Sequence, residues 1–227
     1  MDRFPDRRAA GRALAARLAA FKGPDTFVLG LPRGGLPVAD EVARALGAVL
    51  DIVLVRKIGM PGYSELALGA IAGPEGATMV LNDDLVRLYA IDRATIEAQA
   101  APQRAELARR RKLWGARLEA GALRGKRVIL VDDGIATGAT MRAAIEAVRE
   151  DAPAEVIVAT PVAPPEVMDA MARLADRVVC LATPAAFTAV GLHYADFPQL
   201  DDGEVKDILA AAAVRHGQGE GRDRPAP

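Results

Sequence analysis

The chain has 227 residues, of which 51% are hydrophobic, so it is long enough for one large α/β domain or two small ones with a sizeable core. Its 29 basic and 30 acidic residues give a net charge of −1, which provides no overall attraction to nucleic acid or to an anionic membrane. Cys180 is the only cysteine, which excludes an internal disulfide, and two histidines are too few for a His/Cys metal cage.

The composition of the N-terminal region gives an expectation about location. Four arginines lie within residues 3–12, but Asp2, Asp6 and the absence of serine there differ from an organelle transit peptide. No apolar run approaches the roughly 18 residues that a membrane span requires. We therefore expect a cytoplasmic protein without a membrane partner.

The first part of the chain predicts a β-α-β unit. An alanine-rich helical pattern over residues 6–21 ends at Gly23-Pro24. A short apolar strand, a helix and a second apolar strand follow, over residues 26–31, 36–46 and 49–55. Strands joined through a helix run parallel in one sheet, so this order favours an α/β fold with a parallel sheet.

Two basic features lie at the predicted carboxyl edge of this sheet. The turn Pro32-Arg33-Gly34-Gly35 joins the first strand to the helix, where open α/β sheets bind ligands. Its glycines allow N–H groups to turn towards an anion, and Arg33 supplies charge. Arg56 and Lys57 end the second strand on the same edge, where they form either a solvated strand end or a second clamp on an anion.

The next segment predicts a loop and then a strand pair. Residues 58–63 are rich in glycine and proline and have no periodicity, which predicts a mobile loop. Residues 66–72 and 77–81 predict two strands joined by a Gly/Pro turn.

Residues 82–118 predict a helical insertion, with helices over residues 83–89 and 92–118. The second helix is long and charged, and it carries a basic run at residues 109–112. Such a run is either a solvated face or an RNA-binding surface, and the role of the insertion stays open.

The most informative stretch is VILVDDGIATGATM, residues 128–141. Its four leading apolar residues suit a strand that helices cover on both faces of a parallel sheet. Asp132 and Asp133 follow where the strand should end, and a loop of Gly, Ala and Thr leads into a helix whose N-terminus can bind an anion. Carboxylates would repel a phosphate unless they serve another part of the same ligand, such as sugar hydroxyls or a divalent cation.

Other phosphate-binding motifs fit this stretch less well. A P-loop requires a lysine after Gly138, and a dinucleotide fingerprint requires a different glycine spacing. An acidic pair also ends a strand in phospho-acceptor domains, but these lack a phosphate loop directly downstream. A Gly/Thr turn alone can simply begin a helix, so the combination with the acidic pair is what favours a sugar phosphate.

The motif VILVDDGIATGAT resembles the 5-phosphoribosyl-1-pyrophosphate (PRPP) binding motif of type I phosphoribosyltransferases, over its whole length. The resemblance implies a Rossmann-like parallel sheet of about five strands flanked by helices. It further implies that the acidic pair binds the ribose hydroxyls, that the following loop holds the 5′-phosphate, and that the turn with Arg33 takes the pyrophosphate, often with a non-proline cis peptide. The residues assigned to PRPP binding are Arg33, Gly34, Gly35, Gly134, Ala136, Thr137, Gly138, Ala139 and Thr140, and those assigned to catalysis are Asp132, Asp133, Arg56 and Lys57.

The resemblance also implies a cofactor and limits the acceptor. Mg²⁺ is expected to arrive with PRPP and to lie near Asp132 and Asp133 without a metal cluster of its own. Ala136 stands where enzymes for 6-oxopurines carry an acidic residue, so we expect a different acceptor, such as another nucleobase. In this family a flexible loop in the region of residues 57–76 closes over the reacting centre.

The C-terminal part predicts the rest of the sheet and a hood. Residues 155–160 and 177–181 predict strands, with a helix between them. Residues 190–200 are rich in aromatic side chains, and Tyr194 and Phe197 either contact an acceptor or anchor the core. We expect a hood built from the chain's ends and the insertion, one domain over residues 1–216, and a disordered tail over residues 217–227.

The predicted function is transfer of the phosphoribosyl group from PRPP to a nitrogen acceptor, with release of pyrophosphate. The alternative is a regulator that binds PRPP or a nucleotide without turnover, since one fold can host both. RNA binding through residues 109–112 is a further alternative that the balanced net charge disfavours. The sequence leaves open the acceptor, the presence of turnover and the formation of a homodimer.

Overall fold

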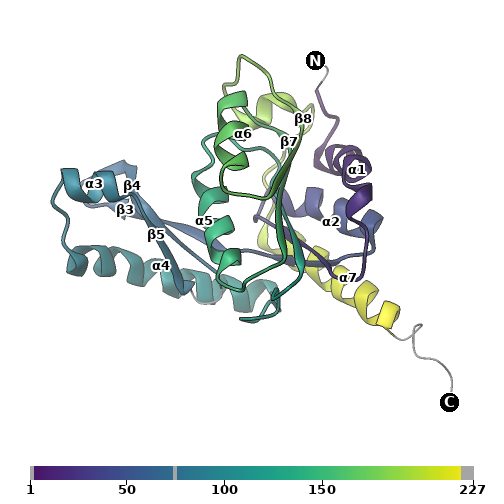
Figure 1. The fold of residues 1–227 in the computed structure, drawn as a ribbon, viewed down its shortest axis with the longest axis horizontal. Coiled ribbons are helices and arrows are strands. Elements are labelled where there is room, and N and C mark those ends of the chain that lie inside the picture. Colours follow the sequence, from purple (N-terminus) through teal and green to yellow (C-terminus); the bar gives the residue numbers. More distant parts are fainter. Residues whose placement is uncertain (1–2, 74–75, 221–227) are drawn as a thin grey trace.

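The computed structural model describes residues 3–73 and 76–220, and its centre is a five-stranded sheet with the strand order β2-β1-β6-β7-β8 (Figure 1). All neighbouring strands in this sheet pair in parallel. The strands are β1 (Thr26–Gly30), β2 (Val49–Ile52), β6 (Arg127–Val131), β7 (Glu155–Val162) and β8 (Arg177–Ala182). The predicted fold class, a parallel sheet of five strands flanked by helices, is confirmed.

Helices cover both faces of the sheet (Figure 1). One face packs against α1 (Arg7–Arg17), α2 (Gly35–Leu46) and α7 (Asp202–Glu220), and the other against α5 (Ala139–Arg149) and α6 (Pro165–Ala172). Ile129 and Val131 of β6 belong to the first core, whereas Val128 and Leu130 belong to the second. Successive strand residues point to opposite faces, so a strand covered on both sides must be apolar throughout.

A second, antiparallel sheet extends to one side of this core. Its strands are β3 (Val55–Met60), β4 (Tyr63–Ala72) and β5 (Thr78–Leu81), and they are followed by α3 (Asp83–Leu88) and α4 (Arg93–Trp114). We call this part, residues 55–73 and 76–114, the arm. It lies beside α5, where Ala70 and Ala72 of β4 pack on Ala143 (Figure 1). The buried side chains at this joint are all alanines, with Val55, Val80 and Ala147 packed against them, so the two parts approach closely there.

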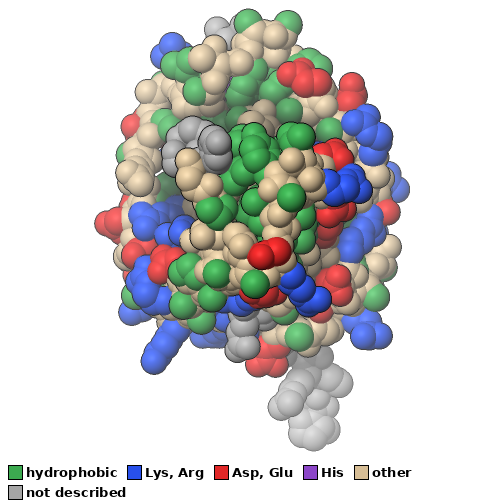
Figure 2. Space-filling model, turned by 90° about the vertical axis from the view of Figure 1, so that its left-hand side faces the viewer, with side chains coloured by type: hydrophobic (Ala, Val, Ile, Leu, Met, Phe, Trp, Pro, Cys, Tyr) green, Lys and Arg blue, Asp and Glu red, His purple; other side chains and the backbone are tan. Residues whose placement is uncertain are grey.

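The view from the arm's side shows how this end of the molecule meets solvent. Hydrophobic side chains gather in the middle of that face, and charged side chains surround them (Figure 2). Leu88 and Tyr89, at the end of α3, are 74% and 41% exposed and are among the large hydrophobic residues in the described chain that remain exposed.

The prediction of one strand over residues 49–55 with Arg56 and Lys57 at its end is wrong. β2 ends at Ile52, and a new strand of the other sheet begins at Val55. Both sheets bury apolar side chains, so the continuous apolar run spans a boundary that its pattern does not mark. The predicted loop over residues 58–63 is also wrong, because β3 continues to Met60 and turns only at Pro61-Gly62. The predicted pairing of residues 66–72 with 77–81 is confirmed by β4 and β5.

Two helix ends differ from the prediction. The long helix α4 stops at Trp114 because Gly115 takes a left-handed conformation (φ 70°), and a residue without a side chain adopts this conformation most easily. The last helix, α7, continues to Glu220, so residues 217–220 of the predicted disordered tail are helical, and residues 221–227 lie outside the described residues.

Nowhere in residues 3–73 and 76–220 is a helix long and apolar enough to cross a membrane.

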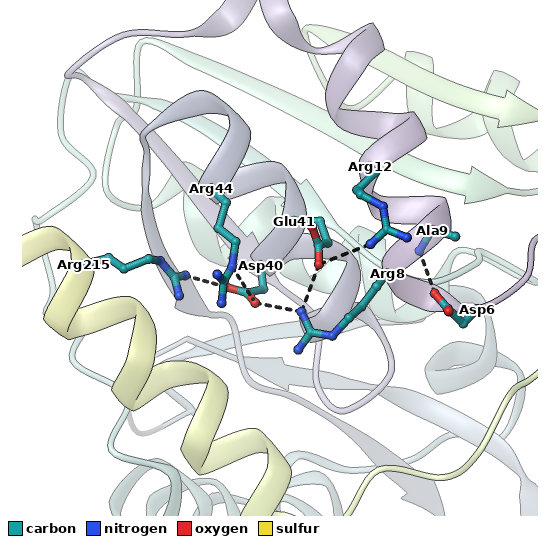
Figure 3. Close-up of polar contacts among 8 residues, drawn as sticks. All are labelled: Asp6, Arg8, Ala9, Arg12, Asp40, Glu41, Arg44 and Arg215. Atoms are coloured by element: carbon teal, nitrogen blue, oxygen red, sulfur yellow. Dashed lines mark hydrogen bonds and ion pairs between the residues drawn. The ribbon is translucent and has the colours of Figure 1, made fainter.

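A buried carboxylate joins the first and last helices to α2. Asp40 is fully buried, and it accepts hydrogen bonds from Arg8 of α1, Arg44 of α2 and Arg215 of α7 (Figure 3). A buried charge is tolerated only when it is paired, so this cluster holds the three helices in one arrangement. The helices from the two ends of the chain are thereby held against α2, the helix that follows the glycine turn.

Candidate functional site

The acidic pair lies where β6 ends. Asp132 is half-buried and Asp133 is 8% exposed. The backbone N–H of Asp133 donates to Oδ1 of Asp132 over 2.9 Å, which fixes the first carboxylate against its own backbone. The two carboxylates therefore lie at the carboxyl edge of the sheet, where open α/β sheets bind ligands.

The loop between β1 and α2 packs directly on this pair. A Cβ atom added at Gly34 would collide with Oδ2 of Asp133, and one added at Gly35 would lie 2.7 Å from the carbonyl oxygen of Val131. Only glycine fits these two approaches. The Pro32–Arg33 peptide bond is cis, which confirms the expected non-proline cis peptide in this loop.

The loop between β6 and α5 presents an open helix N-terminus. Gly138 takes a left-handed conformation (φ 78°) and caps α5 without any side-chain hydrogen bond. Ala136, Thr137 and Ala139 are exposed around it. The first N–H groups of a helix have no partner within the helix, so this turn offers donors and a positive dipole end to an anion.

A hood covers the acidic pair from the side of the chain's ends; we define it as residues 3–6 and 190–201. The predicted contribution of the insertion to the hood is wrong, because its helix α4 lies in the arm, where Gln103 holds Arg56 of β3. Phe4 forms a parallel β-bridge with Tyr194. The N–H of Phe4 donates to the carbonyl of His193, and the carbonyl of Phe4 accepts from the N–H of Ala195. The hydroxyl of Tyr194 donates to the backbone carbonyl of Asp133 over 2.5 Å, and Tyr194 is 2% exposed. Tyr194 is thus an anchor of the hood on the acidic motif, not an exposed acceptor contact.

Arg7 is a site residue that the sequence analysis missed. Its Nε donates to Oδ2 of Asp133 over 2.7 Å, and its Nη1 donates to the carbonyl of Pro198 over 2.7 Å. Its guanidinium lies 3.7 Å from the centre of the Phe197 ring. Nothing in the sequence distinguishes Arg7 from the neighbouring arginines, because its burial against the hood depends on the fold.

The electrostatics of the pair follow from burial. Burial raises the pKa of Asp132 well above its usual value, and the charge of Asp133 raises it further. Burial also raises the pKa of Asp133, while the Arg7 guanidinium opposes that shift. Burial raises the pKa of Tyr194, so its hydroxyl stays a donor. The site therefore resists holding two negative charges unless a ligand or a cation compensates them.

Arg33 is turned towards the C-terminal segment. Its Nη1 donates to the carbonyl of Leu200 over 3.0 Å, and its Nη2 lies 3.0 Å from Oδ1 of Asp202. The side chain is 30% exposed, so part of it still faces solvent.

Arg56 and Lys57 point to opposite faces of β3. Nε of Arg56 donates to Oε1 of Gln103 on α4 over 3.0 Å, away from the phosphate loop. Lys57 lines a cleft of about 640 Å³ between the arm and α5. Among the residues described, the cleft is also lined by Ala67, Gly69, Ala70, Val80, Leu81, Asn82, Asp83, Asp84, Arg87, Thr137, Ala139, Arg142 and Ala143. Lys57 therefore faces the open side of the phosphate loop, whereas the structure places Arg56 elsewhere.

Comparison with known proteins decides the family. A model of the phosphoribosyl transferase domain matches residues 5–195, which span most of the chain and include the acidic pair and both loops. The chain belongs to the phosphoribosyltransferase family. The expected resemblance is thereby confirmed.

Two relatives and one solved structure show the same membership. Proteins of two Mycobacterium tuberculosis strains, named provisionally as phosphoribosyl transferases, are 47% identical over 212 residues, which is 93% of this chain and 47% of each relative. The chain thus spans about half the length of these curated relatives. The crystal structure of TT1426 from Thermus thermophilus is 47% identical, with a TM-score of 0.79 over 92% of this chain and 98% of that one.

In the structure, the predicted site residues fall into two groups. Gly34, Gly35, Asp132 and Asp133 meet at the edge of the sheet, with the loop of residues 134–140 beside them. Arg33 and Arg56 are instead held by other protein groups, near α7 and on α4 respectively. In the described part of the chain, no group of three or more His, Cys, Asp or Glu side chains is placed to hold a metal ion.

Proposed function

We propose that this phosphoribosyltransferase moves the 5-phosphoribosyl group of PRPP to a nitrogen of a small-molecule acceptor and releases pyrophosphate. The observation that carries the proposal is the direct packing of Gly34 and Gly35 on the acidic pair, beside the open N-terminus of α5. A ligand that fills this edge meets donors for two phosphate groups with carboxylates between them. PRPP has its sugar hydroxyls between a 5′-phosphate and a pyrophosphate.

In this proposal the α5 turn, Ala136 to Thr140, binds the 5′-phosphate through N–H groups and threonine hydroxyls. Asp132, the more exposed of the two residues, accepts from the ribose hydroxyls. Asp133 holds the site together through Arg7 and the β1–α2 loop. The Gly34 amide and the Arg33 guanidinium receive the pyrophosphate, whereas the N–H of Gly35 already donates to the carbonyl of Leu31 over 3.0 Å. Lys57 faces the phosphate loop from the arm.

The reaction separates charge, and the site suits both ends. The acceptor nitrogen forms a bond to the anomeric carbon as the bond to pyrophosphate breaks, and the pyrophosphate oxygen takes the electron pair. Positive charge develops on the sugar and negative charge on the leaving group. Asp132 stabilises the first, while Arg33 and the Gly34 amide stabilise the second.

Mg²⁺ is the cofactor we propose. It prefers oxygen ligands and keeps several waters, so it suits a site in which the ligand's own phosphates supply most of the coordination. The carboxylates of Asp132 and Asp133 are the oxygen ligands that lie next to the β1–α2 loop. When bound, Mg²⁺ neutralises part of the pyrophosphate charge.

The acceptor we propose is not a 6-oxopurine. Ala136 provides neither a charge nor a proton at the exposed start of the α5 turn. Purified protein with PRPP, Mg²⁺ and a panel of nucleobases should release pyrophosphate with at least one base other than hypoxanthine or guanine. Binding of PRPP without release for any base would favour the regulator, and absence of PRPP binding would refute the proposed function. Rapid turnover of hypoxanthine would refute the acceptor class alone.

A further inference from the structure

Asp202, the first residue of α7, connects two residues from distant parts of the chain. Its Oδ1 lies 3.0 Å from Nη2 of Arg33 in the β1–α2 loop. The same oxygen accepts a hydrogen bond from Nε1 of Trp114, the last residue of α4, over 3.0 Å. One carboxylate oxygen therefore holds both the arginine proposed for pyrophosphate and the end of the arm's long helix.

The contacts of Arg33 leave it able to bind a ligand. Asp202 and the carbonyl of Leu200 each engage one terminal nitrogen of the guanidinium. A guanidinium carries more N–H donors than these two contacts use, in a rigid planar fork. An anion can therefore approach the remaining donors while the first two contacts persist.

We propose that Asp202 is a positioning residue that holds Arg33 ready for pyrophosphate. This inference rests on the proposed function, in which Arg33 receives the pyrophosphate. A free arginine loses rotational freedom about several bonds when it binds a ligand. A side chain that is already fixed avoids that entropy loss on binding. Asp202 supplies this fixation from the side of the hood.

Trp114 extends the connection to the arm and provides a way to observe it. It is 1% exposed, and the guanidinium of Arg110 lies 5.4 Å from its ring centre. Its helix also holds β3 through Gln103 and Arg56. Trp114 is the only tryptophan in the chain, so its fluorescence reports on the contact with Asp202 without background from other indoles.

The test measures pyrophosphate binding and Trp114 emission together. Inorganic pyrophosphate with Mg²⁺, and separately PRPP with Mg²⁺, is titrated into the wild type, Asp202→Asn and Asp202→Ala by calorimetry and by fluorescence. An ion pair that is about one-third exposed contributes modestly, so Asp202→Ala should weaken pyrophosphate binding about fivefold, and Asp202→Asn should weaken it less because the amide oxygen still accepts from both partners. Because the Asp202 contacts persist, the wild-type emission should stay nearly constant on binding, whereas the free Asp202→Ala protein should emit at a different wavelength because its indole has lost the carboxylate acceptor.

Two further variants separate positioning from folding. Asp207→Asn alters an exposed carboxylate on the same helix and should match the wild type in both measurements. Trp114→Phe removes the indole donor but keeps the Arg33 pair, so its pyrophosphate affinity should stay near that of the wild type in calorimetry. Wild-type pyrophosphate affinity in Asp202→Ala, or a wild-type emission on binding that shifts to that of Asp202→Ala and so reveals loss of the Asp202 contact, would overturn the inference. If the wild type binds neither ligand, the proposed function itself fails.

Discussion

Arg7 and Asp133 form a buried ion pair in which Nε donates to Oδ2 over 2.7 Å, although 126 positions separate them in the sequence. Their side chains are only 9% and 12% exposed. Arg7 also contacts Phe197 and the carbonyl of Pro198, so the pair ties the start of α1 and the hood to the acidic motif. The proposed ribose site is therefore completed by the first helix of the chain.

Arg7→Met should destabilise the protein strongly. Removing one partner of a buried ion pair leaves an uncompensated charge, here on Asp133, and typically costs about 3 kcal/mol or more. Urea denaturation should show this loss in the free energy of unfolding. Arg12→Met is a matched control, because Arg12 is 60% exposed and its pair with Glu41 spans 3.7 Å; its effect should stay within about 0.5 kcal/mol. Equal effects of the two substitutions would contradict the assignment of a buried pair.

Asp132→Asn should weaken PRPP binding while the fold persists. A hydrogen bond to a charged group contributes about 1.5 to 3 kcal/mol, so the affinity for PRPP should fall roughly tenfold or more. Asparagine keeps the shape of the side chain and can still accept from the N–H of Asp133. Calorimetric titration with PRPP and Mg²⁺ measures the change, and wild-type affinity in this variant would remove Asp132 from the ribose site.

The same substitution should raise stability near neutral pH. The pKa of Asp132 is raised in the folded protein above the ordinary value of 3.8. The folded state therefore holds this proton more tightly than the unfolded state, and stability falls as pH rises from 3.8 through the raised pKa. Asparagine does not titrate, so Asp132→Asn should increase the free energy of unfolding by on the order of 1 kcal/mol. This increase should reach its maximum above the raised pKa and shrink as pH falls towards 3.8. Melting curves of both proteins across this range measure it, and a gain that grows on acidification would contradict the sign.

Gly34→Ala should impair both PRPP binding and stability. The added methyl group would collide with Oδ2 of Asp133, so the loop or the carboxylate must move. Overpacking of this kind typically costs about 1 to 3 kcal/mol. Gly23→Ala is the control, because nothing lies within 4 Å of a Cβ there. Thermal unfolding and PRPP titration should separate the two variants, and wild-type behaviour of Gly34→Ala would mean that the loop does not pack on the acidic pair.

How much the sequence could predict depends on how local the cause is. The strand, acidic pair and α5 turn are contiguous, so residues 128–141 were sufficient to predict β6, the helix start and the resemblance. The Arg7 pair and the Asp202 contacts join residues far apart in the sequence, and nothing in the local pattern of either marks them. The prediction assigns Arg56 and Lys57 to one clamp, but strand geometry turns neighbouring residues to opposite faces, so only one of them can face the phosphate loop.

The β3–β4 hairpin is the segment we expect to close over the bound ligand. β5 pairs with β4 only over residues 69–72, so beyond Ile58 the hairpin is a two-stranded ribbon, and its register shifts on both sides of Gly59. An isolated pair of strands is marginally stable in water, and this ribbon begins beside the cleft that Lys57 and Thr137 line. A cationic sugar exposed to bulk water would be captured by water, so the reaction needs a cover while transfer proceeds.

Hydrogen exchange tests this closure. Backbone amides of residues 59–64 should exchange faster than those of residues 69–72 in the free protein, because the latter lie in a strand that is paired on both sides. PRPP with Mg²⁺ should slow exchange in residues 59–64 markedly, while residues 128–131, in the centre of the parallel sheet, serve as the internal reference. Asp132→Asn at the same PRPP concentration should show less protection in the hairpin, since it binds less PRPP. Equal exchange in residues 59–64 with and without a saturating ligand would rule the hairpin out as the cover, and the site would then have to exclude water through the hood alone.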